Sequence, residues 1–174
     1  MSKMRLSDLL DAESMQVMQR GFSQVTGMLA AVVDENGVPV SRAAVRPRFC
    51  FDLTRGTAEG EKRCAECDRA GAKRAMRSGK AEVYTCHAGV CDMAAPIVVD
   101  GRFMGAFVGG QVIVDEPDEE LVRATAAELG IDPDIYLEAI HELPVRSAQE
   151  VADAAGYMGA MAQMLSVMSK ENRS

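Results

Sequence analysis

The sequence predicts an α+β domain with a mostly antiparallel five-stranded sheet, flanked by helices at the N- and C-terminal ends of the chain. Apolar residues recur at helical spacing near both ends, whereas the middle of the chain carries short apolar runs typical of strands. Two turn signals, Asn36-Gly37 and Asp100-Gly101, interrupt these runs as they do in hairpins of antiparallel strands. Helices around five such strands favour an α+β architecture over a sandwich or a bundle.

The first element is an amphipathic helix, or two short ones, that ends near Gly27. Ser7 or Asp11 would cap it, and its apolar face comprises Leu6, Leu9, Leu10, Val17, Phe22 and Val25. Residues 28–43 then change period, and an apolar run meets "DENG" before "VPV" resumes. This pattern predicts a hairpin of two strands with Asn36-Gly37 in its turn.

The middle of the chain is predicted to hold one helix and three strands. Ala65, Ala70, Ala72, Ala75 and Met76 indicate a helix with a small-residue face, closed by Gly79. "EVYTCHAG", residues 82–89, is predicted to form a strand that includes Cys86 and His87. Residues 92–114 are predicted to form two strands joined by Val99-Asp100-Gly101.

Three helices are predicted after the sheet. One carries Pro117 near its first turn and ends at Gly130, and the next is capped by Asp132 with Pro133 at its first position. The last runs from Ser147 to about Ser169, with two heptad series along it: Val151, Met158, Leu165 and Ala154, Met161, Met168. This seam either packs on the sheet of its own domain or serves a homodimer or signal relay, and the sequence leaves both interpretations open.

These elements make one domain: an N-terminal helix in 1–27, a sheet core with a Cys-rich insertion in 28–115, and C-terminal helices in 116–174. A chain of 174 residues is long enough to bury a core without disulfide bonds. The net charge of −7 argues against nucleic-acid binding, and one local basic cluster, Arg42, Arg46, Arg48 and Arg55, is short and scattered.

The chain shows neither a secretory signal nor an apolar run of membrane-spanning length. We therefore expect a cytoplasmic protein with reduced cysteines, which serve as ligands, reactive thiols or core residues. Four of the cysteines, with the adjacent His87, form the candidate metal site: Cys50, Cys64, Cys67 and Cys86. The "CAEC" spacing lets two thiolates reach one ion, so a zinc ion or an iron–sulfur cluster is the predicted cofactor. Two alternatives remain, a redox pair of thiols and a set of small buried apolar side chains.

No catalytic arrangement emerges from the sequence, and we expect no enzymatic activity. There is no serine elbow and no phosphate-binding glycine loop before a helix. Cys86 and His87 would point to opposite faces of a regular strand, so they would not pair as nucleophile and base. His141 lies on a predicted surface helix and is interpreted as structural. Gln111 follows two glycines within a strand, where a ligand or the backbone can approach closely.

The segments "FCFDLTRGTAEGEKRCAECD" and "VYTCHAGVCDMAAPIVVDGRFMGAFVGGQVIV" resemble the PocR-type sensory domain of prokaryotic signalling proteins. The resemblance extends from "LSDLLDAESMQVM" to the final helix. Its joint pattern comprises Phe49-Cys50, Cys64 to Asp68, Cys86 to Gly89, Pro96-Ile97, Asp100-Gly101 and Gly110-Gln111. The chain departs from the family pattern at Val90, where leucine is usual, and at the additional thiol of Cys91.

The resemblance implies a PAS-like ligand-binding domain that senses a small organic ligand such as a simple diol. Such domains pass their signal to an output protein or domain: a transcription regulator, a histidine kinase or a cyclic-nucleotide enzyme. The chain is then either a single-domain member or the sensor portion of a longer protein. Phe49, Cys86, His87 and Gln111 are the predicted ligand-binding residues. In the alternative function, the metal or redox centre is itself the quantity that is sensed.

Overall fold

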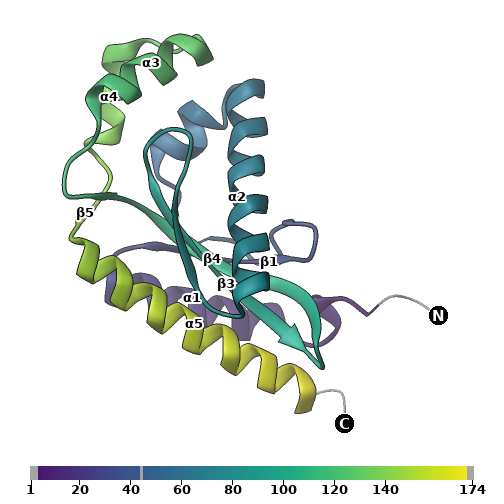
Figure 1. The fold of residues 1–174 in the computed structure, drawn as a ribbon. Coiled ribbons are helices and arrows are strands. Elements are labelled where there is room, and N and C mark those ends of the chain that lie inside the picture. The colour runs from purple at the N-terminus through teal and green to yellow at the C-terminus, as the bar shows by residue number, and fades with distance from the viewer. Residues whose placement is uncertain (1–3, 44, 172–174) are drawn as a thin grey trace.

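The computed structural model describes residues 4–43 and 45–171. It contains a sheet of five strands and seven helical segments of different lengths within those residues (Figure 1). In chain order these are η1 (Leu6–Asp8), α1 (Ala12–Thr26), β1 (Leu29–Asp34), η2 (Phe49–Thr54), α2 (Ala58–Ser78), β2 (Glu82–Thr85), β3 (Cys91–Val99), β4 (Arg102–Val114), α3 (Glu119–Leu129), α4 (Pro133–Ile140), β5 (Val145–Arg146) and α5 (Ala148–Glu171).

The sheet confirms the predicted α+β class and its mostly antiparallel order. Its strands run β1-β4-β3-β2, all antiparallel, and the short β5 pairs with the end of β4 in parallel. One of the five strands differs from the prediction, because the second strand of the 28–43 hairpin is reduced to a single bridge between Val33 and Pro39. Pro39 lacks the amide hydrogen that a longer ladder would need. β5, which the sequence did not reveal, is the fifth strand.

The two faces of the sheet are covered by different helices. Figure 1 shows α1 and α5 side by side on one face and α2 on the other, while α3 and α4 lie beyond one end of the sheet. Val151, Met158 and Leu165 of α5 are buried in the core that α1, α5 and the sheet share. The heptad seam therefore packs on the sheet of its own domain, the first of its two interpretations.

Most helix ends lie where the sequence predicted them. Asp11 and Asp132 cap α1 and α4 with their side chains, and Gly27, Gly79 and Gly130 end three helices in the left-handed conformation. Helix α2 begins earlier than predicted, at Ala58, because the Thr57 side chain caps it by accepting from Gly60 N. The preceding π-helical turn, η2, was not predicted.

The prediction that residues 82–89 form one strand is wrong at its end, because β2 stops at Thr85. The next residues make a tight turn in which Gly89 N donates to Cys86 O and Cys86 N donates to Val90 O. Gly89 has a φ of 82°, which favours glycine. Cys86 and His87 therefore lie on a turn. The expectation that they point to opposite faces of a strand does not apply to them.

One irregularity in the β3–β4 ladder shapes the site. The register shifts between Cys91 and Asp92, which face Val112 and Gly110 on β4. Gln111, the residue skipped by this shift, has a φ of 56°, in the left-handed region that non-glycine residues rarely adopt. Such strain persists where the surrounding structure enforces it, often at binding sites.

The exposed face of α5 offers a small test of the helix itself. Gly156 lies inside α5, and a Cβ added there would meet no atom within 4 Å. Gly156→Ala is expected to stabilise the protein by about 0.5–1 kcal/mol, since glycine costs backbone entropy in a helix. Urea denaturation of the variant and the parent measures this change. A loss of stability would show that this face of α5 is covered in solution.

Candidate functional site

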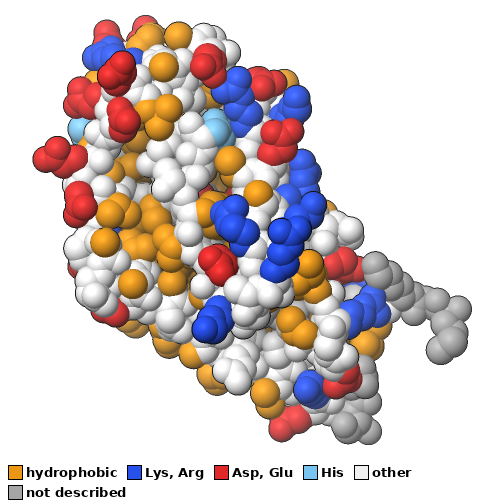
Figure 2. Space-filling view, viewed as in Figure 1, with side chains coloured by type: hydrophobic (Ala, Val, Ile, Leu, Met, Phe, Trp, Pro, Cys, Tyr) orange, Lys and Arg blue, Asp and Glu red, His pale blue; other side chains and the backbone are white. Residues whose placement is uncertain are grey.

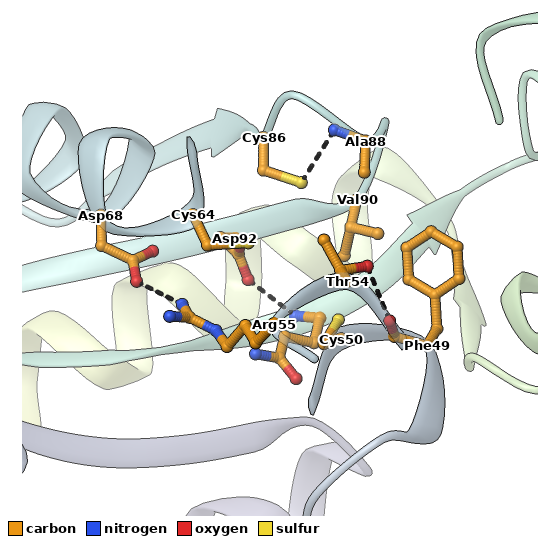
Figure 3. Close-up of a pocket in the computed structure, with 11 residues that line it drawn as sticks. Phe49, Cys50, Thr54, Arg55, Cys64, Asp68, Cys86, Ala88, Val90 and Asp92 are labelled. Atoms are coloured by element: carbon orange, nitrogen blue, oxygen red, sulfur yellow. Dashed lines mark hydrogen bonds and ion pairs between the residues drawn. The ribbon is translucent and has the colours of Figure 1, made fainter. Parts of the chain in front are cut away.

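A small cavity of about 20 Å³ lies between η2, α2 and the β3–β4 bulge (Figure 3). Its lining combines apolar side chains, thiols and charges: Phe49, Cys50, Thr54, Arg55, Cys64, Asp68, Cys86, Ala88, Val90, Asp92 and Gln111. A space of this size holds about one water molecule. We call it the inner cavity.

A second, much larger hollow of about 840 Å³ opens beside it, and we call it the groove. Its floor is the sheet face formed by Leu29, Ala31 and Val33 of β1 with Val108 of β4. One wall is α2, and the other comprises residues 34–37, Pro39, Arg46 and Phe51. Four residues line both hollows and so form the boundary between them: Arg55, Asp68, Asp92 and Gln111.

The Asp92–Gln111 pair lies on the sheet at this boundary. Gln111 N donates to Asp92 Oδ1 at 3.1 Å, a bond that holds the strained Gln111 backbone against β3. Gln111 Oε1 is buried and has no hydrogen-bond partner among the described residues. Burial, reinforced by the nearby charge of Asp68, raises the pKa of Asp92 to about 8. The pair therefore presents buried hydrogen-bonding capacity that the protein does not satisfy.

Arg55 supplies the charged side of the boundary. Its Nη2 lies 2.7 Å from Asp68 Oδ2, and its Nη1 lies 3.2 Å from the carboxylate of Glu61. Tyr84, on β2, donates its hydroxyl to Asp68 Oδ1 at 3.4 Å. Arg55 follows η2 directly, whereas both acids lie on α2. The ion pairs thus join the π-helical turn to the helix that covers the site.

Three of the predicted metal ligands, Cys50, Cys64 and Cys86, line the inner cavity from three different elements. His87 Nε2 lies 3.3 Å from Cys64 Sγ, and Cys67 borders neither hollow. Burial raises the pKa of Cys64 to about 11 and that of Cys86 to about 12, so these thiols are protonated at neutral pH. Across residues 4–43 and 45–171, no three His, Cys, Asp or Glu side chains are grouped so that they could hold a metal ion.

The predicted ligand-binding residues occupy different places. Cys86 lines the inner cavity, and Gln111 lines both hollows. Phe49 forms the apolar end of the inner cavity and stacks on Tyr136 of α4 with ring centroids 4.3 Å apart. His87 lines neither hollow, and its buried Nδ1 has no partner among the described residues. Burial, with the charge of Arg63, lowers the pKa of His87.

Sequence reasoning missed Asp92, Arg55 and Asp68, the charged residues of the boundary. Asp92 carried a local signal, because it is an acidic residue within an otherwise apolar strand pattern, and Asp68 carried one only as the last residue of the Cys64 to Asp68 part of the family pattern. Arg55 and Asp68 look like ordinary surface charges in the sequence, and only the fold brings them together.

Comparison with known proteins places this chain in a family. Residues 8–170 match the model of a family described as the sensory domain found in PocR. The chain belongs to the PocR sensory-domain family. It is 34% identical over 114 residues to the regulatory protein PocR of Salmonella typhimurium, an alignment that covers 66% of this chain and 37% of that protein. The chain thus spans little more than a third of that PocR relative.

Two solved structures are also similar to this PocR domain. One is the GAF domain/HD domain protein from Geobacter sulfurreducens, with 15% identity, a TM-score of 0.44, and 95% of this chain and 98% of that chain covered. The other is the cyanobacteriochrome TePixJ GAF domain, with 20% identity, a TM-score of 0.37, and 82% and 99% covered. In the described part of this PocR domain, no helix has the length and apolar character needed to span a bilayer.

Proposed function

We propose that this PocR domain is a non-enzymatic sensor whose groove binds a small hydroxylated organic molecule, of which a simple diol is the smallest example. The observation that carries this proposal is the buried Gln111 Oε1, which has no partner among the described residues and belongs to the residue whose backbone N donates to the Asp92 carboxyl. A buried acceptor without a partner costs about 1–3 kcal/mol, which a ligand that donates a hydrogen bond would recover. Adjacent hydroxyl groups can donate to Gln111 and exchange hydrogen bonds with Asp92.

The groove has the composition of a small-molecule site. Its floor is apolar, from Leu29, Ala31, Val33 and Val108, and four of its polar residues, Arg55, Asp68, Asp92 and Gln111, lie at the boundary with the inner cavity. Ligand sites usually combine an apolar lining with a few placed polar groups. A short hydrocarbon skeleton would lie on the sheet with its hydroxyl groups toward Asp92 and Gln111.

A non-enzymatic role is supported by the chemistry of the Cys64–His87 contact. A catalytic cysteine has a depressed pKa, so that the thiolate forms near neutral pH. The pKa of Cys64 is instead raised, because burial disfavours the thiolate. His87 is close enough to Cys64 to accept its proton, but the environment favours the neutral pair.

A relay to the terminal helices has a physical basis in Gln19 of α1. Its Nε2 donates to Ala30 O on β1 at 3.2 Å and to Arg42 O at 3.0 Å, and Ser41 donates to its Oε1. This buried side chain joins α1 to the segment that leads into the groove wall. A ligand that shifts the groove wall would also shift α1 through these hydrogen bonds. An output protein or domain that contacts α1 would then detect the new position of the helix.

Binding to the groove is tested by calorimetric titration with propylene glycol, glycerol, lactate and glycerate. Gln111→Leu is expected to weaken whichever compound binds by about tenfold or more, because the donated bond is lost in a buried place. Gln163→Leu, an exposed change on α5, is the matched control and should bind like the parent. Binding by none of these compounds, or equal binding by both variants, contradicts the proposal.

A second candidate function, sensing of a metal or redox state, is favoured by one observation. Three thiols border the inner cavity, and His87 contacts one of them. A zinc ion or an iron–sulfur cluster would require these residues to move closer and lose their protons. Elemental analysis and an absorption spectrum of anaerobically purified protein test this, since a bound stoichiometric metal would favour it over the ligand sensor.

A further inference from the structure

The charged residues of the groove fall into two groups, those with a hydrogen-bond or ion-pair partner in the protein and those without an ion-pair partner, and the acids belong to the first. Asp68 and Glu61 pair with Arg55, and Asp92 Oδ1 accepts from Gln111 N. Asp34 Oδ1 accepts from the backbone of Asn36 and Val38 in the turn. The remaining acid, Glu35, also has an interaction partner. Each acidic side chain of the groove therefore has at least one partner within the protein, and Asp92 keeps further hydrogen-bonding capacity.

The cations of the groove differ. Arg46, Arg69 and Lys73 line it, and none of them forms an ion pair with another described residue. Arg46 has only the face of the Phe51 ring, 4.4 Å from its guanidinium carbon. An anion that enters the groove can pair with a cation that has no ion-pair partner of its own.

Their positions come from both walls of the groove. On α2, the groove-lining residues Ala65, Arg69, Ala72 and Met76 follow helical spacing along one stripe, with Lys73 beside it. Arg46 approaches from the opposite wall. The three cations thus line one hollow from both of its walls, without an ion pair to another described residue. Figure 2 shows Lys and Arg side chains gathered along α2, whereas Asp and Glu are frequent over α3 and α4.

We propose that the ligand of the groove is a small hydroxy-carboxylate, whose anionic group is held by Arg69 and Lys73 with Arg46 opposite. This inference rests on the proposed sensor function and adds a charge requirement to it. The hydroxyl end of the molecule meets Asp92 and Gln111, so the two ends of the groove recognise the two ends of the ligand. A neutral diol satisfies only one of these ends.

The arrangement also explains why a small acid is favoured over a nucleic acid or a phosphorylated protein. The three cations are exposed side chains that line a hollow of about 840 Å³, which Asp34 and Glu61 also line. A polyanion would meet those acids, whereas a single carboxylate needs to pair only with the cations. Charge-assisted hydrogen bonds from arginine to carboxylate are among the stronger polar contacts.

The test compares glycerate with propylene glycol by calorimetric titration of the full chain, at low and at high ionic strength. Glycerate is expected to bind at least tenfold more tightly than propylene glycol, with an affinity that falls as salt is added. The double variant Arg69→Gln/Lys73→Gln should lose about tenfold in glycerate affinity and leave propylene glycol affinity unchanged. Arg69→Lys, which keeps the charge, should retain most of the glycerate affinity.

Arg77→Gln is the matched control, because Arg77 is exposed on α2 but does not line the groove. It should bind glycerate like the parent. Equal or tighter binding of propylene glycol, or a double variant that binds glycerate as the parent does, overturns the charge requirement while leaving the sensor function intact. Failure of both compounds to bind overturns the charge requirement together with the sensor function.

Discussion

Phe49→Ala is expected to destabilise the protein by about 3–5 kcal/mol, the usual cost of removing a buried aromatic ring. Phe49 is 1% exposed and stacks on Tyr136, whose ring is also fully buried. The ring lies in the cluster that joins η2 to α3 and α4, so its loss leaves a void between the inner cavity and the C-terminal helices. Denaturation with urea at constant pH measures the change in unfolding free energy.

Two control variants test whether the cost of Phe49→Ala comes from the loss of a buried ring. Phe51→Ala removes the same ring two positions later, where it is only partly buried, and should cost clearly less than Phe49→Ala. Phe49→Leu keeps most of the volume and should cost about 1–2 kcal/mol. If Phe49→Ala lowers the unfolding free energy no more than Phe51→Ala does, the Phe49 ring does not stabilise the cluster between η2, α3 and α4.

The Thr54 hydroxyl forms two hydrogen bonds next to the Phe49 ring. The Thr54 hydroxyl donates to Phe49 O at 2.7 Å, which leaves the Thr54 oxygen to accept from the Tyr136 hydroxyl, also at 2.7 Å. The π-helical turn is thereby closed at its end and bonded to α4. Arg55, the next residue, is held at the boundary of the two hollows by this arrangement.

Much of this fold follows from local sequence signals. Helix α1 ends at Gly27 and α4 begins after Asp132, because the capping chemistry at these positions depends on neighbouring residues only. The β3–β4 hairpin forms at Asp100-Gly101, where both residues have positive φ angles. These features need no knowledge of distant contacts, so periodicity and turn residues predict them.

The elements that were missed depend on distant partners. β5 is only two residues long, and its strand geometry comes from pairing with Ile113 and Val114. The strand that was expected to include Cys86 and His87 ends earlier, because Gly89 folds the chain back on itself. In the first case pairing with β4 determines the conformation, and in the second case the turn at Gly89 does. The local apolar pattern determines neither.

The candidate site could be predicted only in part for the same reason. The cysteine pattern led to the inner cavity, which Cys50, Cys64 and Cys86 border. The ion pair between Arg55 and Asp68 and the β-bulge at Gln111 are products of the assembled fold. No periodicity marks a residue that becomes important through a register shift.

The stability of the protein is expected to fall as pH rises from about 4 to about 8, through the contribution of Asp92. Burial raises its pKa from 3.8 to about 8, so in this range the folded protein retains a proton that the unfolded chain has lost. Because the unfolded state binds fewer protons, the unfolding free energy decreases with pH, by up to about 1.4 kcal/mol per unit. Below about pH 4 and above about pH 8, the contribution of Asp92 to the unfolding free energy does not change with pH.

Asp92→Asn isolates the effect, because the amide oxygen can still accept from Gln111 N while the side chain no longer titrates. The difference between parent and variant, measured by urea denaturation at several pH values, cancels the opposite contribution of His87, whose pKa is lowered. The parent should lose stability relative to the variant steadily from about pH 4 to about pH 8. A flat difference curve would mean that Asp92 is solvated and charged in the folded protein, and the hydrogen-bonding chemistry assigned to the groove would then have to rest on Gln111 alone.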